Sequence, residues 1–489
     1  MAEVTGQSNG TTVARNTTYL TGALIGQKVL SFLYALILFR LLGISISGDY
    51  LSALSFVALF SIFLDFGLTQ AFIRQTARDA QAGVWQLRQI LTFKLTMALV
   101  VVAALFGTIA VLDAFGRSHP DLIFLKWAAA IMVIDSLTLT SYGYLRGIQR
   151  LEYESIGTLL HRVMVMIVGI TGLVLGLPPV ITIIAVFAGS TANLLYATFH
   201  LWRRGITWRP TWSWVRLRPM LLTALPFGLA GLFVAIYSSS DNILLSIFSG
   251  RRAVGIYGLG FKIMAAFQIL PAALVAAVYP AMSAAFVQQH DRLVNIFRNS
   301  VKYLMVISLP VSVALFVLAK DIVLIGWTRV WLEAVWPLRI LVIGLPFIFL
   351  NFPVGYLLNA ANKQTRNTVN IGIAMLFNLA LNIIFIQLYS YKVVAINSTI
   401  SSILLVSLGL FAARRIVTLP WRELFIMISK IIVASLAMGV IGALVIPAEP
   451  TLIRIILAAA VMAVFYLLVI FSFRIVKVND LKQVLQRFR

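Results

Sequence analysis

The sequence contains no cysteine and only four histidines. Without thiols there is no disulfide framework, thiol nucleophile, zinc-thiolate site or iron–sulfur cluster. The four histidines are scattered along the chain, so no His-rich metal site is predicted. Charged residues make up 11% of the chain and hydrophobic residues 61%, against about 25% and about 45–50% in a soluble domain. This composition excludes an ordinary soluble protein and indicates a membrane protein.

Acidic residues are scarce as well: 16 Asp and Glu stand against 39 Lys and Arg, which gives a formal net charge of +23. A basic balance can indicate binding to nucleic acid or anionic surfaces, but here the charges must first be placed relative to the bilayer. A cleaved signal peptide has a basic region, then a short apolar region, then a cleavage site of small residues. Residues 1–18 do not follow this order. We therefore expect the first apolar segment to direct membrane insertion.

Signatures of common enzymes are missing too. The chain has no GxxxxGK[ST] loop, no HExxH helix and no GxSxG elbow. The segments predicted to face the outer side are short, so acid–base residues have little room to gather there. The sequence predicts that the protein is not an enzyme and uses no bound cofactor or metal.

Long apolar runs occupy most of the chain. A helix needs about 20 largely apolar residues to cross the hydrocarbon core of a bilayer, and fourteen segments meet this criterion. They are approximately residues 19–43, 50–72, 89–112, 121–145, 155–176, 179–202, 219–249, 253–285, 299–319, 337–361, 367–390, 393–413, 423–447 and 451–474. We therefore predict an all-α membrane protein with 14 transmembrane helices.

The basic residues between these segments predict the orientation. Lys and Arg concentrate on the cytoplasmic side of short loops. With the N-terminus inside, the inner segments hold 24 Lys and Arg and the outer segments hold 9. Both termini are therefore expected in the cytoplasm. Most of the excess positive charge then faces lipid headgroups, and no nucleic-acid partner is needed to explain it.

Two short patterns recur at nearly equal spacing. The pattern G-x4-G-x-Y begins at Gly43 and again at Gly250, 207 residues later. The triplet Gly-Tyr-Leu begins at Gly143 and again at Gly355, 212 residues later. The common spacing indicates a duplication of six spans. Since six is even, the two halves have the same orientation, as in transporters built from parallel repeats.

The duplication predicts the domain organisation. Residues 1–202 form an N-terminal six-helix bundle and residues 219–415 a C-terminal six-helix bundle, the two being parallel. Residues 203–218 form a cytoplasmic linker rich in Trp and Arg, whose composition suits a membrane interface better than a nucleic-acid surface. Residues 416–489 add transmembrane helices 13 and 14 and a basic tail.

Three blocks of sequence carry a family resemblance. They are FRLLGISISGDYLSALSFVALFSIFLDFGLTQAFIRQTAR (39–78), SDNILLSIFSGRRAVGIYGLGFKIMAAFQILPAALVAAVYPAMSAAF (240–286) and GYLLNAANKQTRNTVNIGIAMLFNLALNIIFI (355–386). The chain resembles the bacterial polysaccharide transporters, the oligosaccharide-lipid flippases of the multidrug/oligosaccharidyl-lipid/polysaccharide exporter superfamily. Fourteen spans is also the usual number in that family.

The resemblance implies a flippase of the bacterial inner membrane that moves a polyprenyl-pyrophosphate-linked oligosaccharide by alternating access. A proton or sodium gradient would be a possible energy source, and a glycan polymerase and glycosyltransferases would be possible partners. One alternative is a cation-coupled multidrug antiporter of the same superfamily, which an acidic cavity would favour. A second alternative is a membrane glycan polymerase or ligase, which would need a catalytic loop.

Charges within predicted spans are candidate functional residues, because charge in a membrane normally faces a bundle interior or a wet cavity. Lys28, Asp65, Lys94 and Arg162 all lie within roughly 5–9 Å of the midplane, at 1.5 Å per residue. They are predicted to form a cationic cavity floor that holds phosphates or acidic sugars, with Asp65 pairing with one of the cations. Asp65 is also a candidate for coupling or gating. In the alternative interpretation, Asp65 and Lys94 form a structural pair and Lys28 extends to the interface.

Three further charges are assigned to spans 4, 7 and 8. Asp241 and Lys262 lie at similar depth from the outer surface, so a salt bridge between them is predicted. The pair could be structural or could serve a coupled gate, and Lys262 is also a candidate for substrate binding. Asp135, near the middle of span 4, is a candidate for coupling-ion binding.

Overall fold

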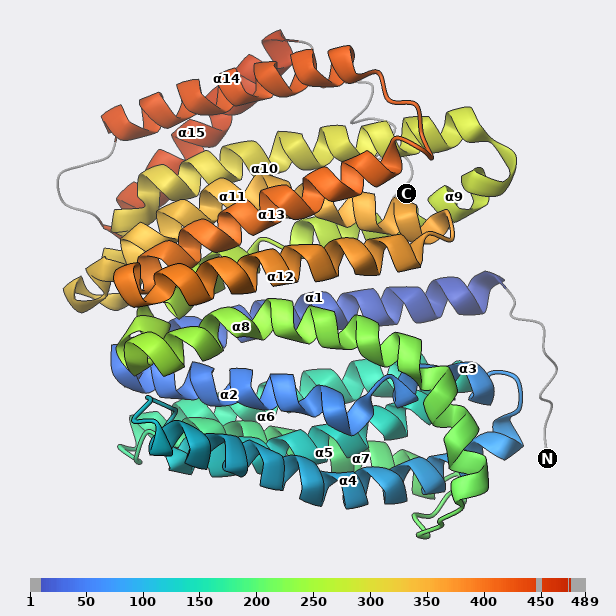
Figure 1. Cartoon of the computed structure of the whole chain (residues 1–489). Coiled ribbons are helices and arrows are strands. Elements are labelled where there is room, and N and C mark those ends of the chain that lie inside the picture. The colour runs from blue at the N-terminus through green and yellow to red at the C-terminus, as the bar shows by residue number, and fades with distance from the viewer. Residues whose placement is uncertain (1–9, 446–450, 474, 476–489) are drawn as a thin grey trace. The chain divides into compact units, whose positions relative to one another are not determined.

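The computed structural model shown in Figure 1 describes residues 10–445, 451–473 and 475 of the chain. Every regular element within these ranges is a helix. In chain order they are α1 (Gly10–Leu42), α2 (Ile44–Asp65), α3 (Leu68–Thr76), α4 (Ala80–Ala114), α5 (Leu122–Gly147), α6 (Leu151–Val174), α7 (Ile181–Trp202), α8 (Trp214–Ala266), α9 (Ile269–Gln288), α10 (His290–Trp327), η1 (Arg329–Ala334), α11 (Val335–Ala360), α12 (Gln364–Tyr389), α13 (Tyr391–Ala413), α14 (Trp421–Val445) and α15 (Leu452–Ser472). The predicted all-α class is therefore confirmed.

Twelve segments of the described part of the chain are long and apolar enough to cross a membrane. One of them, Trp214–Val287, is 74 residues long, and since one crossing needs about 20 residues, its length allows two. Gly250 interrupts the helix within it, at φ 78° and ψ 173°. α1 is not among the twelve, although residues 22–39 carry a single charge, Lys28. The chain is thus a multi-pass membrane protein, with twelve candidate spans where fourteen were predicted.

Two of the predicted spans are broken. The run 50–72 ends its first helix at Asp65, because Phe66 (φ 38°) and Gly67 (φ 78°) adopt left-handed backbone conformations before α3 begins. α8 and α9 are separated by two residues just upstream of Pro271. The proline ring clashes with the carbonyl four residues earlier, here that of Phe267, which accounts for the break.

The chain divides into two units. Unit 1 comprises residues 1–258 and 386–390, and unit 2 comprises residues 259–385 and 391–489. Unit 1 thus contains α1 to α7 and most of α8, whereas unit 2 contains α9 to α11 and α13 to α15. The division into two six-helix bundles at residues 203–218 stays a prediction.

Each unit has an apolar core between its helices. In unit 1, Phe72 and Leu87 belong to a buried cluster built from α3, α4, α5, α7 and α8. In unit 2, Phe297 and Ile431 belong to a larger cluster that joins α9, α10, α11, α13, α14 and α15. Because lipid tails are as apolar as these side chains, close packing contributes more to the association of such helices than the hydrophobic effect does.

The linker 203–218 lies against α4. The Arg88 Nε donates a hydrogen bond to the Thr207 carbonyl at 2.9 Å, and the Thr211 amide donates to the Thr92 hydroxyl at 3.0 Å. These contacts hold the linker at one end of α4. They also give Arg88 and Thr92 of that helix hydrogen-bond partners.

The 207-residue repeat has a counterpart in the backbone. Gly43, at φ 74° and ψ 177°, precedes α2 in nearly the same conformation that Gly250 adopts within α8. Gly48 packs against the backbone of Arg251, and Gly255 packs against the backbone of Ile44, so closely that a Cβ atom fits at neither glycine. Since each partner pair maps onto the other by the same offset, the two copies of the pattern meet reciprocally.

The buried carboxylate of Asp49 links this contact between the two glycine patterns to α5. Asp49 is 3% exposed, and its Oδ2 lies 3.2 Å from Nη1 of Arg251. Its Oδ1 accepts a hydrogen bond from the backbone amide of Asp121 at 3.3 Å. One side chain thus ties the starts of α2 and α5 to the segment that follows the Gly250 break.

Candidate functional site

A cavity of about 450 Å³ lies among α2, α5, α6 and α7 of unit 1. Apolar side chains supply most of its wall, as expected within a helical bundle. Its polar lining residues are Tyr50, Ser61, Asp65, Asp135, Ser136, His161 and Arg162. We call this space the unit-1 cavity. Three of the predicted site residues, Asp65, Asp135 and Arg162, are therefore brought together around one space.

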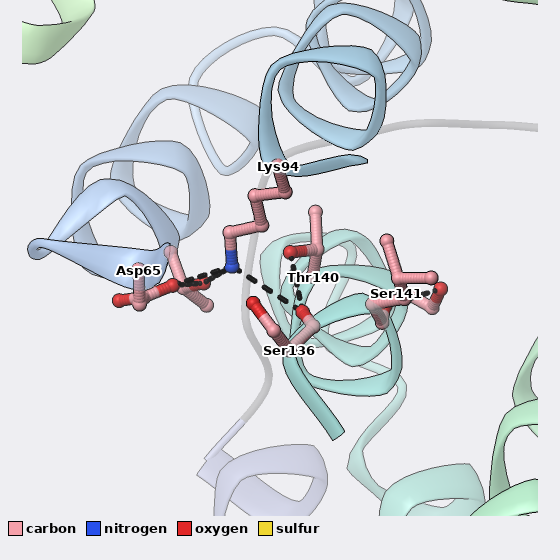
Figure 2. A network of polar contacts seen from close by, with 7 residues as sticks. Asp65, Lys94, Ser136, Thr140 and Ser141 are labelled. Atoms are coloured by element: carbon pink, nitrogen blue, oxygen red, sulfur yellow. Dashed lines mark hydrogen bonds and ion pairs between the residues drawn. The ribbon is translucent and has the colours of Figure 1, made fainter. Parts of the chain in front are cut away.

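Asp65 is held in place by an ion pair next to the cavity. Its Oδ1 lies 2.6 Å from the Nζ of Lys94, which is 1% exposed. The Lys94 ammonium also donates to the Ser136 carbonyl and to the Thr69 hydroxyl, both at 3.3 Å. Figure 2 shows the lysine reaching from α4 between Asp65 of α2 and Ser136 of α5. A break in α2 directly after Asp65 thus coincides with a contact that connects three helices.

Lys94 is consequently enclosed by protein and does not line the unit-1 cavity. The cavity is also not uniformly cationic, because Asp65 and Asp135 face it together with Arg162. The expected electropositive floor is therefore replaced, in this cavity, by a mixed set of charges. The reason is that depth along a helix can be counted from the sequence, whereas the direction of a side chain depends on packing.

Three polar atoms at this cavity have no hydrogen-bond partner among the described residues. They are Nε of Arg162, Nε2 of His161 and Oγ of Ser136, all of them buried. Buried polar groups in proteins are normally hydrogen-bonded, to protein or to an ordered water or ligand. The three side chains line the cavity, and a polar ligand there reaches these buried atoms only when the side chains turn toward it.

Asp135 differs from Asp65 in its surroundings. Its side chain is exposed and lines the cavity. Within the described ranges, no basic side chain lies within ion-pair distance of its carboxylate. Arg162 lines the same cavity. Asp135 is thus an accessible carboxylate, whereas Asp65 is already neutralised by Lys94.

Tight packing holds the walls of the unit-1 cavity. Tyr142 of α5 donates a hydrogen bond to Oδ1 of Asn193 of α7 at 2.6 Å. Gly157 of α6 lies against both side chains, and a Cβ atom there would come within 2.6 Å of the Asn193 oxygen. Arg146 and Glu154 form a two-pronged ion pair across the turn between α5 and α6. These contacts hold α6, the helix that carries His161 and Arg162, against α5 and α7.

The remaining predicted residues lie elsewhere. Lys28 is exposed on α1 and does not line the unit-1 cavity. Asp241 of unit 1 accepts a hydrogen bond from the Tyr257 hydroxyl at 2.6 Å. Lys262 belongs to unit 2 and is exposed. The predicted pairing of Asp241 with Lys262, and the roles assigned to all these residues, stay predictions.

Sequence reasoning missed Tyr50, Ser136 and His161. Tyr50 is the tyrosine of the first copy of the repeated pattern, but its place in a cavity wall leaves no signal in the sequence. His161 precedes Arg162 directly, and two polar residues in an apolar run could have indicated a wet surface. Among the described residues, no group of three or more His, Asp or Glu is arranged to hold a metal ion.

Known families match two parts of the chain. Residues 13–286 match the polysaccharide biosynthesis protein family, and residues 226–384 match the MatE family. The probable lipid II flippase MurJ of Vibrio cholerae serotype O1 is 25% identical over 253 residues. That alignment covers 46% of this chain and 45% of the flippase, so the chain matches less than half the length of this relative.

Solved structures share the fold over a longer range. The lipid II flippase MurJ in an inward closed conformation has a TM-score of 0.77 at 17% identity, covering 93% of this chain and 98% of that chain. An inward-facing multidrug resistance MATE family transporter of the MOP superfamily has a TM-score of 0.65 at 14% identity, covering 79% and 94%. At these sequence identities, the similarity shows that the chains share a fold.

These matches confirm the resemblance that the three sequence blocks indicated. They also confirm the prediction of a transporter and not an enzyme. The solved structures that share the fold are named as a lipid II flippase and as a transporter of the MOP superfamily. The first match covers more than half of the sequence. The chain therefore belongs to the polysaccharide biosynthesis protein family.

Proposed function

We propose that the protein is a flippase that moves a polyprenyl-pyrophosphate-linked oligosaccharide across the bacterial inner membrane by alternating access. The observation that carries this proposal is the family match over residues 13–286. The names of the related flippases, which state lipid II as their substrate, support a lipid-linked cargo. In this proposal the chain crosses the membrane fourteen times, with α1 as the first crossing and two crossings in Trp214–Val287.

The unit-1 cavity would contribute to binding the polar part of the substrate. Arg162 presents a guanidinium whose Nε has no partner among the described residues, and guanidinium groups form strong, paired hydrogen bonds to phosphate and carboxylate oxygens. His161 and Ser136 would bind sugar hydroxyls. Lys28 and Lys262, both exposed, are proposed to add positive charge for the anionic part of the substrate.

Asp135 is proposed to couple transport to a proton or sodium gradient. An accessible carboxylate without an ion-pair partner among the described residues can bind a cation and release it. Asp65 is already occupied by Lys94, so we propose that it positions the cavity wall. Asp241 is proposed to take part in gating through the Tyr257 contact.

The test is transport in reconstituted vesicles. A fluorescent polyprenyl-pyrophosphate-linked glycan is placed in vesicles that contain the purified protein, and its arrival in the outer leaflet is followed with a membrane-impermeant quencher. Arg162→Ala should lower the flipping rate at least about tenfold, since a lost charge-assisted hydrogen bond contributes about 1.5–3 kcal/mol. The control Arg150→Ala removes an exposed arginine that pairs with Glu152 outside the cavity, and it should flip normally. Equal rates for both variants would refute the role of Arg162.

Topology is tested separately. Reporter tags in the linker 203–218 and after Arg489 should both report the cytoplasm, because both segments are rich in basic residues. Membrane fractionation of the bacterial host should place the protein in the inner membrane. A periplasmic signal from either tag would contradict fourteen crossings with both termini inside. Co-purification with a polymerase or glycosyltransferases would support the proposed partners.

A multidrug antiporter is the second candidate. The MatE match over residues 226–384 favours it, and so does the Asp135 carboxylate in the unit-1 cavity, because a cationic drug needs an anionic partner. The same vesicles distinguish the two functions. Gradient-driven uptake of a cationic dye without movement of the glycan would support the antiporter and overturn the flippase.

A further inference from the structure

A second cavity, of about 400 Å³, lies in unit 2 between α10, α14 and the residues that follow α15. Its lining residues are Arg298, Asn299, Lys302, Glu423, Ile426, Met427, Lys430, Phe473 and Ile475. We call it the unit-2 cavity. It lies outside the residues assigned to transport above. It includes Lys430, a cation inside a predicted span for which the proposed function gives no role.

The charged side chains that line this cavity lie on the facing sides of α10 and α14. Arg298 and Lys302 are one turn apart on α10, and Glu423 and Lys430 are two turns apart on α14. The two helices are packed together through buried neighbours of these residues. Three cations and one carboxylate thus share a small space. The net charge of this lining is positive by two.

Within the described residues, the ion pair between Arg298 and Glu423 in this cavity is weak. Nη1 of Arg298 lies 3.9 Å from Oε2 of Glu423, and the two side chains are 40% and 73% exposed. Exposed ion pairs at such distances have small interaction energies. The guanidinium therefore keeps most of its capacity to bind another anion.

The cavity is amphipathic and extends from the first turn of α14 about two turns farther into that helix. Glu423 is in the first turn of α14, whereas Lys430 lies nine residues into that helix, which is about 13 Å at 1.5 Å per residue. Ile426, Met427 and Phe473 provide apolar surface beside these charges. Positive side chains at the cytoplasmic ends of spans, next to apolar walls, suit a ligand that has phosphates at one end and acyl chains at the other.

We propose that the unit-2 cavity binds the headgroup of an anionic phospholipid from the cytoplasmic leaflet, with Arg298, Lys302 and Lys430 contacting its phosphate oxygens and Phe473 and Ile426 contacting its acyl chains. A headgroup with two phosphates, as in diphosphatidylglycerol, matches the net charge of two. The site would anchor α10, α14 and α15 to that leaflet.

The experiment measures lipid binding to the purified full-length protein in neutral detergent. Fluorescent diphosphatidylglycerol is titrated against the wild type, the double variant Lys302→Gln/Lys430→Gln and the control Lys363→Gln/Arg366→Gln. The control removes two exposed basic residues near the start of α12, outside the cavity. The cavity variant should bind about 25-fold more weakly, at about fivefold per charge, and the control should match the wild type. Equal binding by all three proteins would overturn the proposal.

Competition identifies the source of the phosphate. Unlabelled diphosphatidylglycerol should displace the probe at lower concentration than phosphatidylglycerol, and phosphatidylcholine should not displace it. Polyprenyl diphosphate and inorganic pyrophosphate are tested in parallel. Stronger displacement by either of them than by the phospholipids would overturn the phospholipid assignment. If the double variant elutes as an aggregate, Lys430→Arg and Lys430→Gln are compared, and binding retained only by arginine supports the site, whereas equal binding overturns it.

Discussion

Lys94 and Lys430 are both cations within predicted spans, and the structure treats them differently. Lys94 of unit 1 is enclosed by protein, with Asp65 at 2.6 Å and two further oxygen acceptors. Lys430 of unit 2 is exposed and lines a cavity in which positive charge prevails. A charge enclosed in a bundle has its counter-ion within the protein, whereas an exposed charge in an open cavity can take one from the membrane. Burial therefore distinguishes a structural cation from a binding cation.

The largest effect is expected when Lys94 is removed. Lys94→Met leaves the Asp65 carboxylate without its cation, and breaking a buried pair costs about 3–5 kcal/mol. Thermal unfolding followed by fluorescence-detected gel filtration should show a large loss of stability. Lys430→Met, the matched change in the unit-2 cavity, should unfold almost like the wild type. Similar losses for the two variants would remove the distinction between a structural and a binding cation.

The double variant Asp65→Leu/Lys94→Met sharpens the same point. Replacing both members of a buried pair with apolar side chains is often neutral for stability. The double variant should therefore be more stable than Lys94→Met alone. A double variant as unstable as the single one would mean that the lysine acts through its other contacts, to Ser136 and Thr69.

A medium effect is expected from crowding the walls of the unit-1 cavity. Gly157→Leu forces a side chain against Tyr142 and Asn193, and overpacking costs about 1–3 kcal/mol. Gly107→Leu in α4 is the control, because a Cβ atom there meets nothing within 4 Å. Unfolding midpoints of the two variants in the same detergent provide the measurement. Equal midpoints would show that the walls yield easily, contrary to a cavity fixed by packing.

The smallest change in stability is expected from the carboxylates of the two cavities. Glu423→Gln removes an exposed pair at 3.9 Å and should change stability by less than about 0.5 kcal/mol. It should also strengthen diphosphatidylglycerol binding, because the net charge of the unit-2 cavity rises.

Asp135→Asn should likewise leave folded protein at its normal amount but abolish gradient-driven transport. Transport by Asp135→Asn at the wild-type rate would exclude Asp135 as the coupling residue.

Counting residues in the sequence gives a position along each span, whereas the direction of a side chain is known only from the structure. Counting residues along apolar runs placed Asp65, Asp135 and Arg162 at levels where the structure shows a shared cavity. The same counting placed Lys28 with them, although its side chain does not line that cavity. The direction of a side chain around the helix axis depends on which neighbours pack against it, and one sequence carries little information about that. The break after Asp65 could not be predicted for a related reason: the apolar run continues unchanged through Phe66 and Gly67, where the helix ends.

The reciprocal contact of Gly48 with Arg251 and of Gly255 with Ile44 has a consequence for the origin of the chain. In a symmetric dimer, residue i of one subunit meets residue j of the other, and j meets i in return. The two glycine patterns meet in that manner within one polypeptide. A chain with a single copy of the pattern would thus carry a self-complementary surface, and two such chains inserted in the same direction could pair through it. The chain holds within one polypeptide an arrangement that such a homodimer would otherwise form between two subunits.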